Sequence, residues 1–92
     1  MTENKTAQKV FKLASDDGLH ARPAGLFVKA VSAFQSTIEV EIKGVKKNGK
    51  SIMSLMSLGA TNGDEVKVTA NGSDAEAALQ SIEDLFARNF SA

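Results

Sequence analysis

Gly18-Leu19-His20-Ala21-Arg22-Pro23-Ala24 is the stretch from which the rest of the fold can be interpreted. It holds the only histidine and the only proline of the chain, and one of its two arginines. Pro23 sets φ for a first helical turn, where its missing N–H costs nothing. Apolar residues then recur at helical spacing, at Ala24, Phe27, Val28, Val31 and Phe34. A helix is therefore predicted from about Ala21 to Ala33, with His20 at its N-terminal end.

The position of His20 suits chemistry on an anion. Free backbone N–H groups and the positive end of the helix dipole favour negative charge there, and the backbone of Ala21 lies at this end. Arg22 adds a fork of donors that fits phosphate oxygens. Such a nucleophile could accept a phosphoryl group and pass it on. A lone histidine is also common as a surface or capping residue without chemistry, and the spacing alone leaves both interpretations open.

The composition describes one small globular domain over residues 1–92 and excludes several classes of function. Eleven basic and eleven acidic residues cancel, which argues against binding to nucleic acid or a membrane surface. The absence of cysteine excludes disulfides and thiolate catalysis, and one histidine without an acidic cluster predicts no metal and no cofactor. The polar N-terminus lacks a signal-peptide core, and no stretch is long enough to span a membrane. A cytoplasmic monomer is expected.

The remaining pattern predicts an α+β fold with the order βαββαβα. Met1–Thr6 is expected to be a tail, and turn residues separate the elements at Ser15–Gly18, Lys43-Gly44, Asn48-Gly49, Gly59, Asn62-Gly63 and Asn71-Gly72. Ser73 and Glu76 form a capping-box pattern that opens the last helix. Alternating strands imply a sheet with one face in solvent and one face covered by the helices. The predicted elements are strands Lys9–Leu13, Ile38–Ile42, Val45–Lys47 and Glu65–Ala70, and helices Ala21–Ala33, Ser51–Leu58 and Ser73–Arg88.

The predicted short helix, with Ser51 as its N-cap, carries more apolar residues than one face can bury. Leu55 and Leu58 are expected in the core, which leaves Ile52, Met53 and Met56 partly exposed. Methionine suits an adaptable interface, although a plain core stripe is the alternative. On the first helix, Leu26 is predicted to point outward beside Lys29, and Gly25 lies bare within the first turns. The last helix should bury the stripe Ala75, Ala78, Leu79, Ile82, Leu85 and Phe86.

Lysines gather before the short helix, at Lys43, Lys46, Lys47 and Lys50. Such a group usually keeps an edge strand solvated and discourages aggregation. Attraction of acidic partners is a secondary interpretation.

Two motifs resemble those of the HPr family, the histidine-containing phosphocarriers of the bacterial phosphoenolpyruvate-dependent phosphotransferase system. Gly18 to Ala24 is similar to the family's active-site signature. Lys50-Ser51-Ile52-Met53, continued by Leu55-Met56-Ser57-Leu58-Gly59, is similar to the signature around its regulatory serine. The order and separation of the two motifs match, and the similarity covers nearly the whole chain.

The resemblance implies an open-faced β-sandwich, in which three helices cover one face of a four-stranded antiparallel sheet. It further implies that His20 takes a phosphoryl group through Nδ1 from phosphorylated Enzyme I and passes it to sugar-specific enzyme IIA domains. Arg22 and Ala21 would stabilise the phosphate. Asp17 could cap the first helix, as a small polar residue does there in the family, or it could tune the site through a negative charge that opposes the phosphate. Such a carrier is not a stand-alone enzyme with a free small-molecule substrate. Partner docking would involve Gly25, Leu26, Lys29, Ile52, Met53 and Met56.

Ser51 matches the serine that an ATP-dependent HPr kinase/phosphorylase modifies in part of the family. Phosphate at an N-cap is tolerated by the helix, but its charge beside Ile52 and Met53 would weaken docking of an acidic partner. In those members the modified protein also binds a catabolite-control transcription factor. A nitrogen-branch phosphocarrier and a regulatory paralogue that carries no phosphate on histidine remain alternatives.

Overall fold

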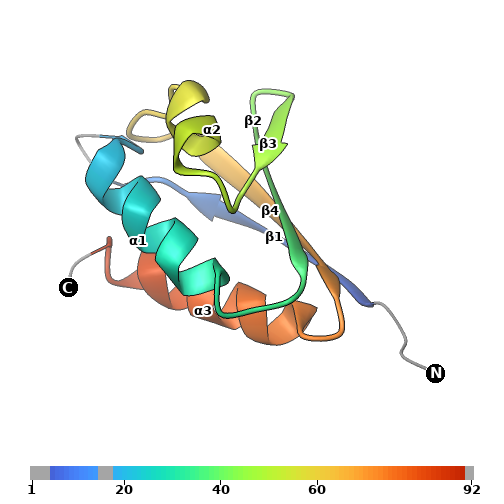
Figure 1. Ribbon diagram of the computed structural model, residues 1–92. Helices are drawn as coiled ribbons and strands as arrows, with labels where there is room; N and C mark the ends of the chain where they lie inside the picture. Colours follow the sequence, from blue (N-terminus) through green and yellow to red (C-terminus); the bar gives the residue numbers. More distant parts are fainter. Residues whose placement is uncertain (1–4, 15–17, 91–92) are drawn as a thin grey trace.

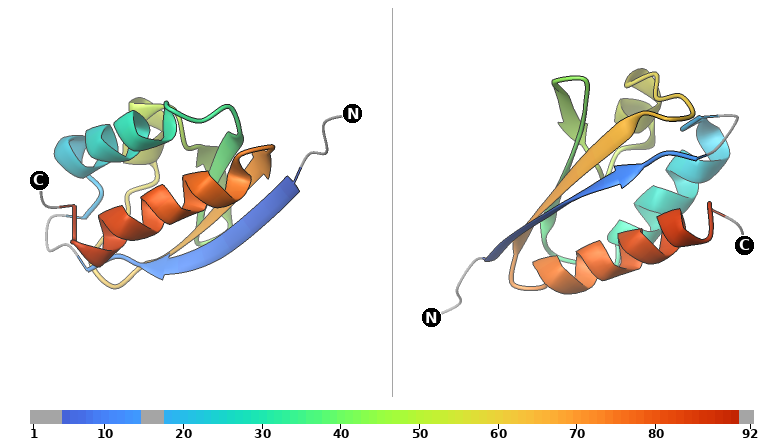
Figure 2. Two further views of the ribbon diagram at one scale, coloured as in Figure 1. Left: turned by 90° about the horizontal axis from the view of Figure 1, so that it is seen from below. Right: turned by 180° about the vertical axis from the view of Figure 1, so that it is seen from behind.

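The computed structural model describes residues 5–14 and 18–90. These residues form a four-stranded antiparallel sheet in the order β1-β4-β2-β3, with three helices on one face (Figure 1). The two views of Figure 2 show α1 and α3 side by side on that face. The predicted α+β class, order and one-sided layering are confirmed. The elements are β1 (Lys5–Lys12), α1 (Ala21–Val31), β2 (Thr37–Ile42), β3 (Val45–Asn48), α2 (Ile52–Ser57), β4 (Glu65–Gly72) and α3 (Ala75–Ala87).

The first strand starts earlier than predicted. β1 begins at Lys5, because its backbone pairs with β4 as far as Lys5 opposite Gly72. The polar residues before Lys9 carry no strand signal of their own, so a long-range ladder decides this boundary. Beyond the end of β1, the Leu13 amide donates to the Asp64 carbonyl at 2.9 Å, and the Leu13 side chain is fully buried.

The core lies between the sheet and the helices, as the apolar pattern predicts. α1 buries Ala24, Phe27 and Val31, while Val28 and Phe34 are half-buried against the core. The predicted stripe of α3 is buried, apart from the half-buried Phe86. The ring of Phe86 stacks on that of Phe11, with the ring centroids 4.6 Å apart.

The start of α3 corrects the predicted capping box. Asp74, not Ser73, is the N-cap residue, and its side chain makes no bond to its own helix. Its carboxylate instead accepts hydrogen bonds from the backbone amides of Gln35 and Ser36, both at 2.9 Å, and from the Ser36 hydroxyl. These bonds, with that of the Ser36 hydroxyl foremost, lower the pKa of Asp74. Asp74 thus ties the start of α3 to the loop before β2, a contact over more than thirty residues of sequence.

Candidate functional site

His20 is the N-cap residue of α1, as predicted. Its backbone is extended, at φ −86° and ψ −165°, and its carbonyl accepts the first helical hydrogen bond, from the Ala24 amide at 3.0 Å. Its side chain is exposed and makes no capping bond to the helix. His20 therefore lies at the end of α1 where the terminal amides, including that of Ala21, favour negative charge.

The segment before His20 is tied to the loop that follows α2. Gly18 has φ +69°, and a Cβ atom there would collide with the Ala60 carbonyl. The Leu19 amide donates to the same carbonyl at 3.2 Å, and the Leu19 side chain is buried. This close approach requires glycine and fixes the backbone from which His20 projects.

A shallow hollow joins the two sequence motifs. It is lined by Leu19, His20, Met56, Gly59, Ala60 and Thr61. Met56 therefore brings the exposed side of α2 next to His20. Sequence reasoning did not include Ala60 and Thr61, and it assigned Gly59 only to the helix end. The contact of Ala60 with this segment is made by its backbone carbonyl, so its side chain gave no signal in the sequence.

A short turn holds this loop in shape. The Asp64 carboxylate accepts hydrogen bonds from the Thr61 amide at 2.9 Å and the Thr61 hydroxyl at 3.2 Å. The bond from the Thr61 amide is the main cause of the lowered pKa of Asp64, and Lys43 nearby also lowers it.

Arg22 is held by the other end of the chain. Its Nη1 donates to the Phe90 carbonyl at 3.0 Å, which uses one of the five N–H donors of the guanidinium. The Phe90 ring is buried and packs edge-on against Phe86, with the centroids 5.0 Å apart. Asn89 and Phe90 both have positive φ, so this turn is strained and is held by the buried ring. Phe90 was missed by sequence reasoning because its partner is 68 residues away.

The docking residues predicted on α1 differ in exposure. Lys29 is exposed, whereas Gly25 and Leu26 are half-buried. Leu26 packs against the edge of the core, which corrects its predicted outward position. A Cβ atom at Gly25 would meet no neighbour within 4 Å, so the fold itself does not require glycine there.

The short helix α2 agrees closely with the prediction. Ser51 is its N-cap, and its hydroxyl accepts a hydrogen bond from the Ser54 amide at 3.2 Å. Leu55 is fully buried, and Leu58 is half-buried against the core. Ile52, Met53 and Met56 are exposed, at 41%, 82% and 44%.

One lysine of the predicted basic patch has a structural role. The Nζ of Lys50 donates to the Phe34 carbonyl at 2.7 Å, just beyond the end of α1. Lys50 thereby fixes the approach to Ser51, whereas the other three lysines of the patch are exposed.

Other predictions can be stated only for the described residues. Asp17 lies outside them. Within residues 5–14 and 18–90, no three metal-ligating side chains gather at one place. No helix in the same ranges has the length and apolar character needed to cross a membrane.

A family model described as "PTS HPr component phosphorylation site" matches residues 7–88. The chain belongs to the HPr family. A crystal structure of HPr from Thermoanaerobacter tengcongensis is 44% identical, with a TM-score of 0.88, over 91% of this chain and 94% of that one. The HPr from Bacillus anthracis is 43% identical, with a TM-score of 0.78, over 89% and 94%.

Some structural neighbours of this chain are named for catabolite repression. Crh, the Bacillus subtilis catabolite repression protein, forms an intertwined dimer with a swapped domain. It is 41% identical, with a TM-score of 0.73, over 82% of this chain and 86% of that one. Membership of the HPr family supports a phosphocarrier role in the phosphotransferase system.

Proposed function

We propose that His20 is the phosphoryl-accepting residue of this HPr-family chain. In the proposed reaction, Nδ1 of the neutral imidazole attacks the phosphorus atom of phosphorylated Enzyme I. The new N–P bond forms as the donor's bond to phosphorus breaks, and that electron pair returns to the donor. The reverse chemistry then passes the phosphoryl group to an enzyme IIA domain. The single observation that carries the proposal is that His20 is exposed at the N-cap position of α1, the helix end that favours an anion.

Arg22 is proposed to stabilise charge on the phosphoryl group in transit. It lies two residues from His20, and its contact with the Phe90 carbonyl limits where the guanidinium can move. The open hollow beside His20 suits an acceptor histidine that enters from another protein. The predicted absence of a free small-molecule substrate, the cytoplasmic location and the monomeric state belong to this proposal. Size-exclusion chromatography would test the monomer, since Crh is a dimer.

The direct test is incubation with phosphoenolpyruvate and purified Enzyme I. We expect one phosphoryl group, labile in acid and stable in base, that maps to His20 and is absent from His20→Ala. No transfer from an active Enzyme I would contradict the proposal for the sugar branch. The donor of the nitrogen branch would then be the next candidate.

The role of Arg22 has a matched control, because the chain has only one other arginine. We expect Arg22→Met to slow phosphorylation by about 100-fold, the usual cost of one charge-stabilising donor. Arg88→Met removes the same charge from an exposed residue at the C-terminal end of α3, two residues before Phe90, and should change the rate by less than about twofold, as expected for a surface charge. Equal rates for the two variants would remove Arg22 from the reaction.

Ser51 is proposed as a regulatory phosphorylation site for an HPr kinase/phosphorylase. Its hydroxyl is half-exposed at an N-cap, where phosphate is tolerated, and exposed Ile52 and Met53 follow it. The added charge would weaken docking of Enzyme I and create a form suited to a catabolite-control transcription factor. ATP and the kinase should modify the wild type and Ser57→Ala but not Ser51→Ala. The alternative is a regulatory paralogue, since the chain is also similar to Crh. Failure of His20 phosphorylation would favour this alternative.

A further inference from the structure

The covered face of the sheet is open to solvent along the edge strand β3. Val45 lies opposite Ile42 and Lys47 opposite Val40, and side chains of directly paired residues share one face. Ile42 and Val40 are core residues, exposed by only 3% and 0%. Val45, on the same face, is 49% exposed, and Lys47 is exposed as well. The core face therefore continues past β2 into solvent.

This open strip adjoins the exposed side of α2. The short helix packs beside β3, and Figure 1 shows the two elements as neighbours. Val45 and the α2 side chains Ile52, Met53 and Met56 are four of the five large apolar side chains that are exposed among the described residues. Val45 thus extends the apolar surface already proposed for docking on α2.

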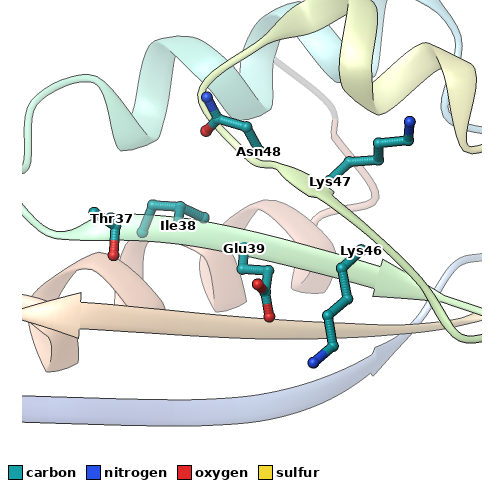
Figure 3. A pocket seen from close by; sticks show the side chains of 6 residues that line it. All are labelled: Thr37, Ile38, Glu39, Lys46, Lys47 and Asn48. Atoms are coloured by element: carbon teal, nitrogen blue, oxygen red, sulfur yellow. The ribbon is translucent and has the colours of Figure 1, made fainter.

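The side chains of Lys46 and Lys47, which are neighbours on β3, lie on opposite faces of the sheet. Figure 3 shows Lys46 on the same side as Glu39, whereas Lys47 extends away from both, toward α2. Lys46 also lies directly opposite Glu41, so its charge is balanced by nearby carboxylates. Lys47 lies opposite a valine, and the chain between Ile42 and Gly63 has four lysines and no acidic residue.

We propose that Val45 and Lys47, here called the β3 shelf, are part of the surface that binds the phosphoryl donor of His20. The donor would place an apolar side chain over Val45 and a carboxylate near Lys47. Charge complementarity and continuity with the apolar face of α2 select an acidic protein surface as the occupant. This inference rests on the proposed function and extends its docking surface beyond α1 and α2.

The chain offers matched controls for each residue of the shelf. Lys46 neighbours Lys47 on the same strand but faces the other side of the sheet. Val10 on β1 is a second exposed valine, at 53%, on the opposite edge of the sheet. The test compares Val45→Thr/Lys47→Gln with Val10→Thr/Lys46→Gln, two double variants with identical changes in composition and charge. All four side chains are exposed, and unchanged melting temperatures would verify the folds.

The measurement is the steady-state rate of His20 phosphorylation by Enzyme I at about 20 mM and about 500 mM salt. We expect the shelf variant to lower kcat/KM about tenfold at low salt, through KM with kcat unchanged. The loss should shrink at high salt, because the charge contribution is screened. The control variant should stay within about twofold of the wild type. The single variants Lys47→Gln and Val45→Thr separate the contribution of charge from that of the apolar contact.

Three outcomes would overturn the inference. Wild-type kinetics for the shelf variant, or an equal loss of kcat/KM in both double variants, would show that the β3 shelf does not bind the donor. An effect confined to kcat would indicate altered chemistry at His20 rather than docking. If the wild type itself accepts no phosphoryl group from Enzyme I, the proposed function is wrong. The proposed binding of the donor to the β3 shelf is then wrong as well.

Discussion

The N-termini of α1 and α2 are built differently, although each is preceded by a residue in extended conformation. The Ser51 hydroxyl accepts a hydrogen bond from the Ser54 amide, so it stabilises its own helix. His20 has the same position at α1 but makes no capping bond with its side chain. The imidazole can therefore be modified without the loss of a capping bond, whereas a change at Ser51 also affects the helix.

Asp74, at the start of α3, is a third kind of N-cap residue. Its carboxylate bonds the loop at Gln35 and Ser36 and not its own helix. The three N-cap side chains thus differ: Ser51 bonds its own helix, Asp74 bonds a distant loop, and His20 makes no capping bond. The comparison teaches that an N-cap position does not by itself define a role, and substitutions can separate the three.

The largest effect should come from the buried side of α2. Leu55 is fully buried and anchors the helix that carries Ser51. We expect Leu55→Ala to lower the free energy of unfolding by about 2–5 kcal/mol, because it leaves a cavity. Met53→Ala, at 82% exposure, should change it by less than about 0.5 kcal/mol. Urea titration measures both, and equal losses would contradict the division of α2 into a buried and an open side.

Asp74 should give the next largest effect, and it should depend on pH. Its pKa is lower in the folded chain, so its ionised form stabilises the fold above the unfolded pKa of about 3.9. This contribution is lost as the pH falls through the lower folded value. Asp74→Ala should therefore lower the melting temperature at pH 7 and narrow its difference from the wild type in acid. Glu76→Ala, on an exposed residue of the same helix, is the control. A difference that does not vary with pH would mean that the carboxylate bonds are unimportant.

The free-energy costs of removing the Ser51 and His20 side chains should differ by a smaller amount. Ser51→Ala removes a capping bond and should cost about 1 kcal/mol of unfolding free energy. His20→Ala removes no capping bond and should cost less than about 0.5 kcal/mol, although we expect it to abolish phosphorylation. Thermal unfolding of the two variants tests the distinction, and a larger loss for His20→Ala would reverse it.

The smallest effect should be a gain. Gly25 lies within α1, and an added Cβ would meet nothing within 4 Å. Gly25→Ala should therefore raise the free energy of unfolding by about 0.5–1 kcal/mol, through a better helix propensity. Gly18→Ala is the opposite control, because that residue has positive φ and its Cβ would collide with Ala60. A loss at Gly25 would point to a contact that the helix makes in the folded chain.

Local pattern was enough for the helices and for the central strands. Pro23 and the apolar spacing after it predicted the start of α1 at Ala21, and Ser51 predicted the cap of α2. The alternation in Ile38–Ile42 predicted β2 almost to its bounds. Each of these signals acts over a few residues, within one turn of helix or one strand, so it can be read directly from the chain.

The element order, the one-sided layering and the position of His20 at a helix end could therefore be predicted from local patterns in the chain. Only the tertiary structure decided that Phe90 holds Arg22, that Asp74 bonds Ser36, and that β1 extends to Lys5. It also decided which side of β3 stays open beside α2. The physical reason is distance along the chain. These contacts join residues that lie far apart in sequence, and no local propensity or spacing encodes which backbone group a side chain will meet.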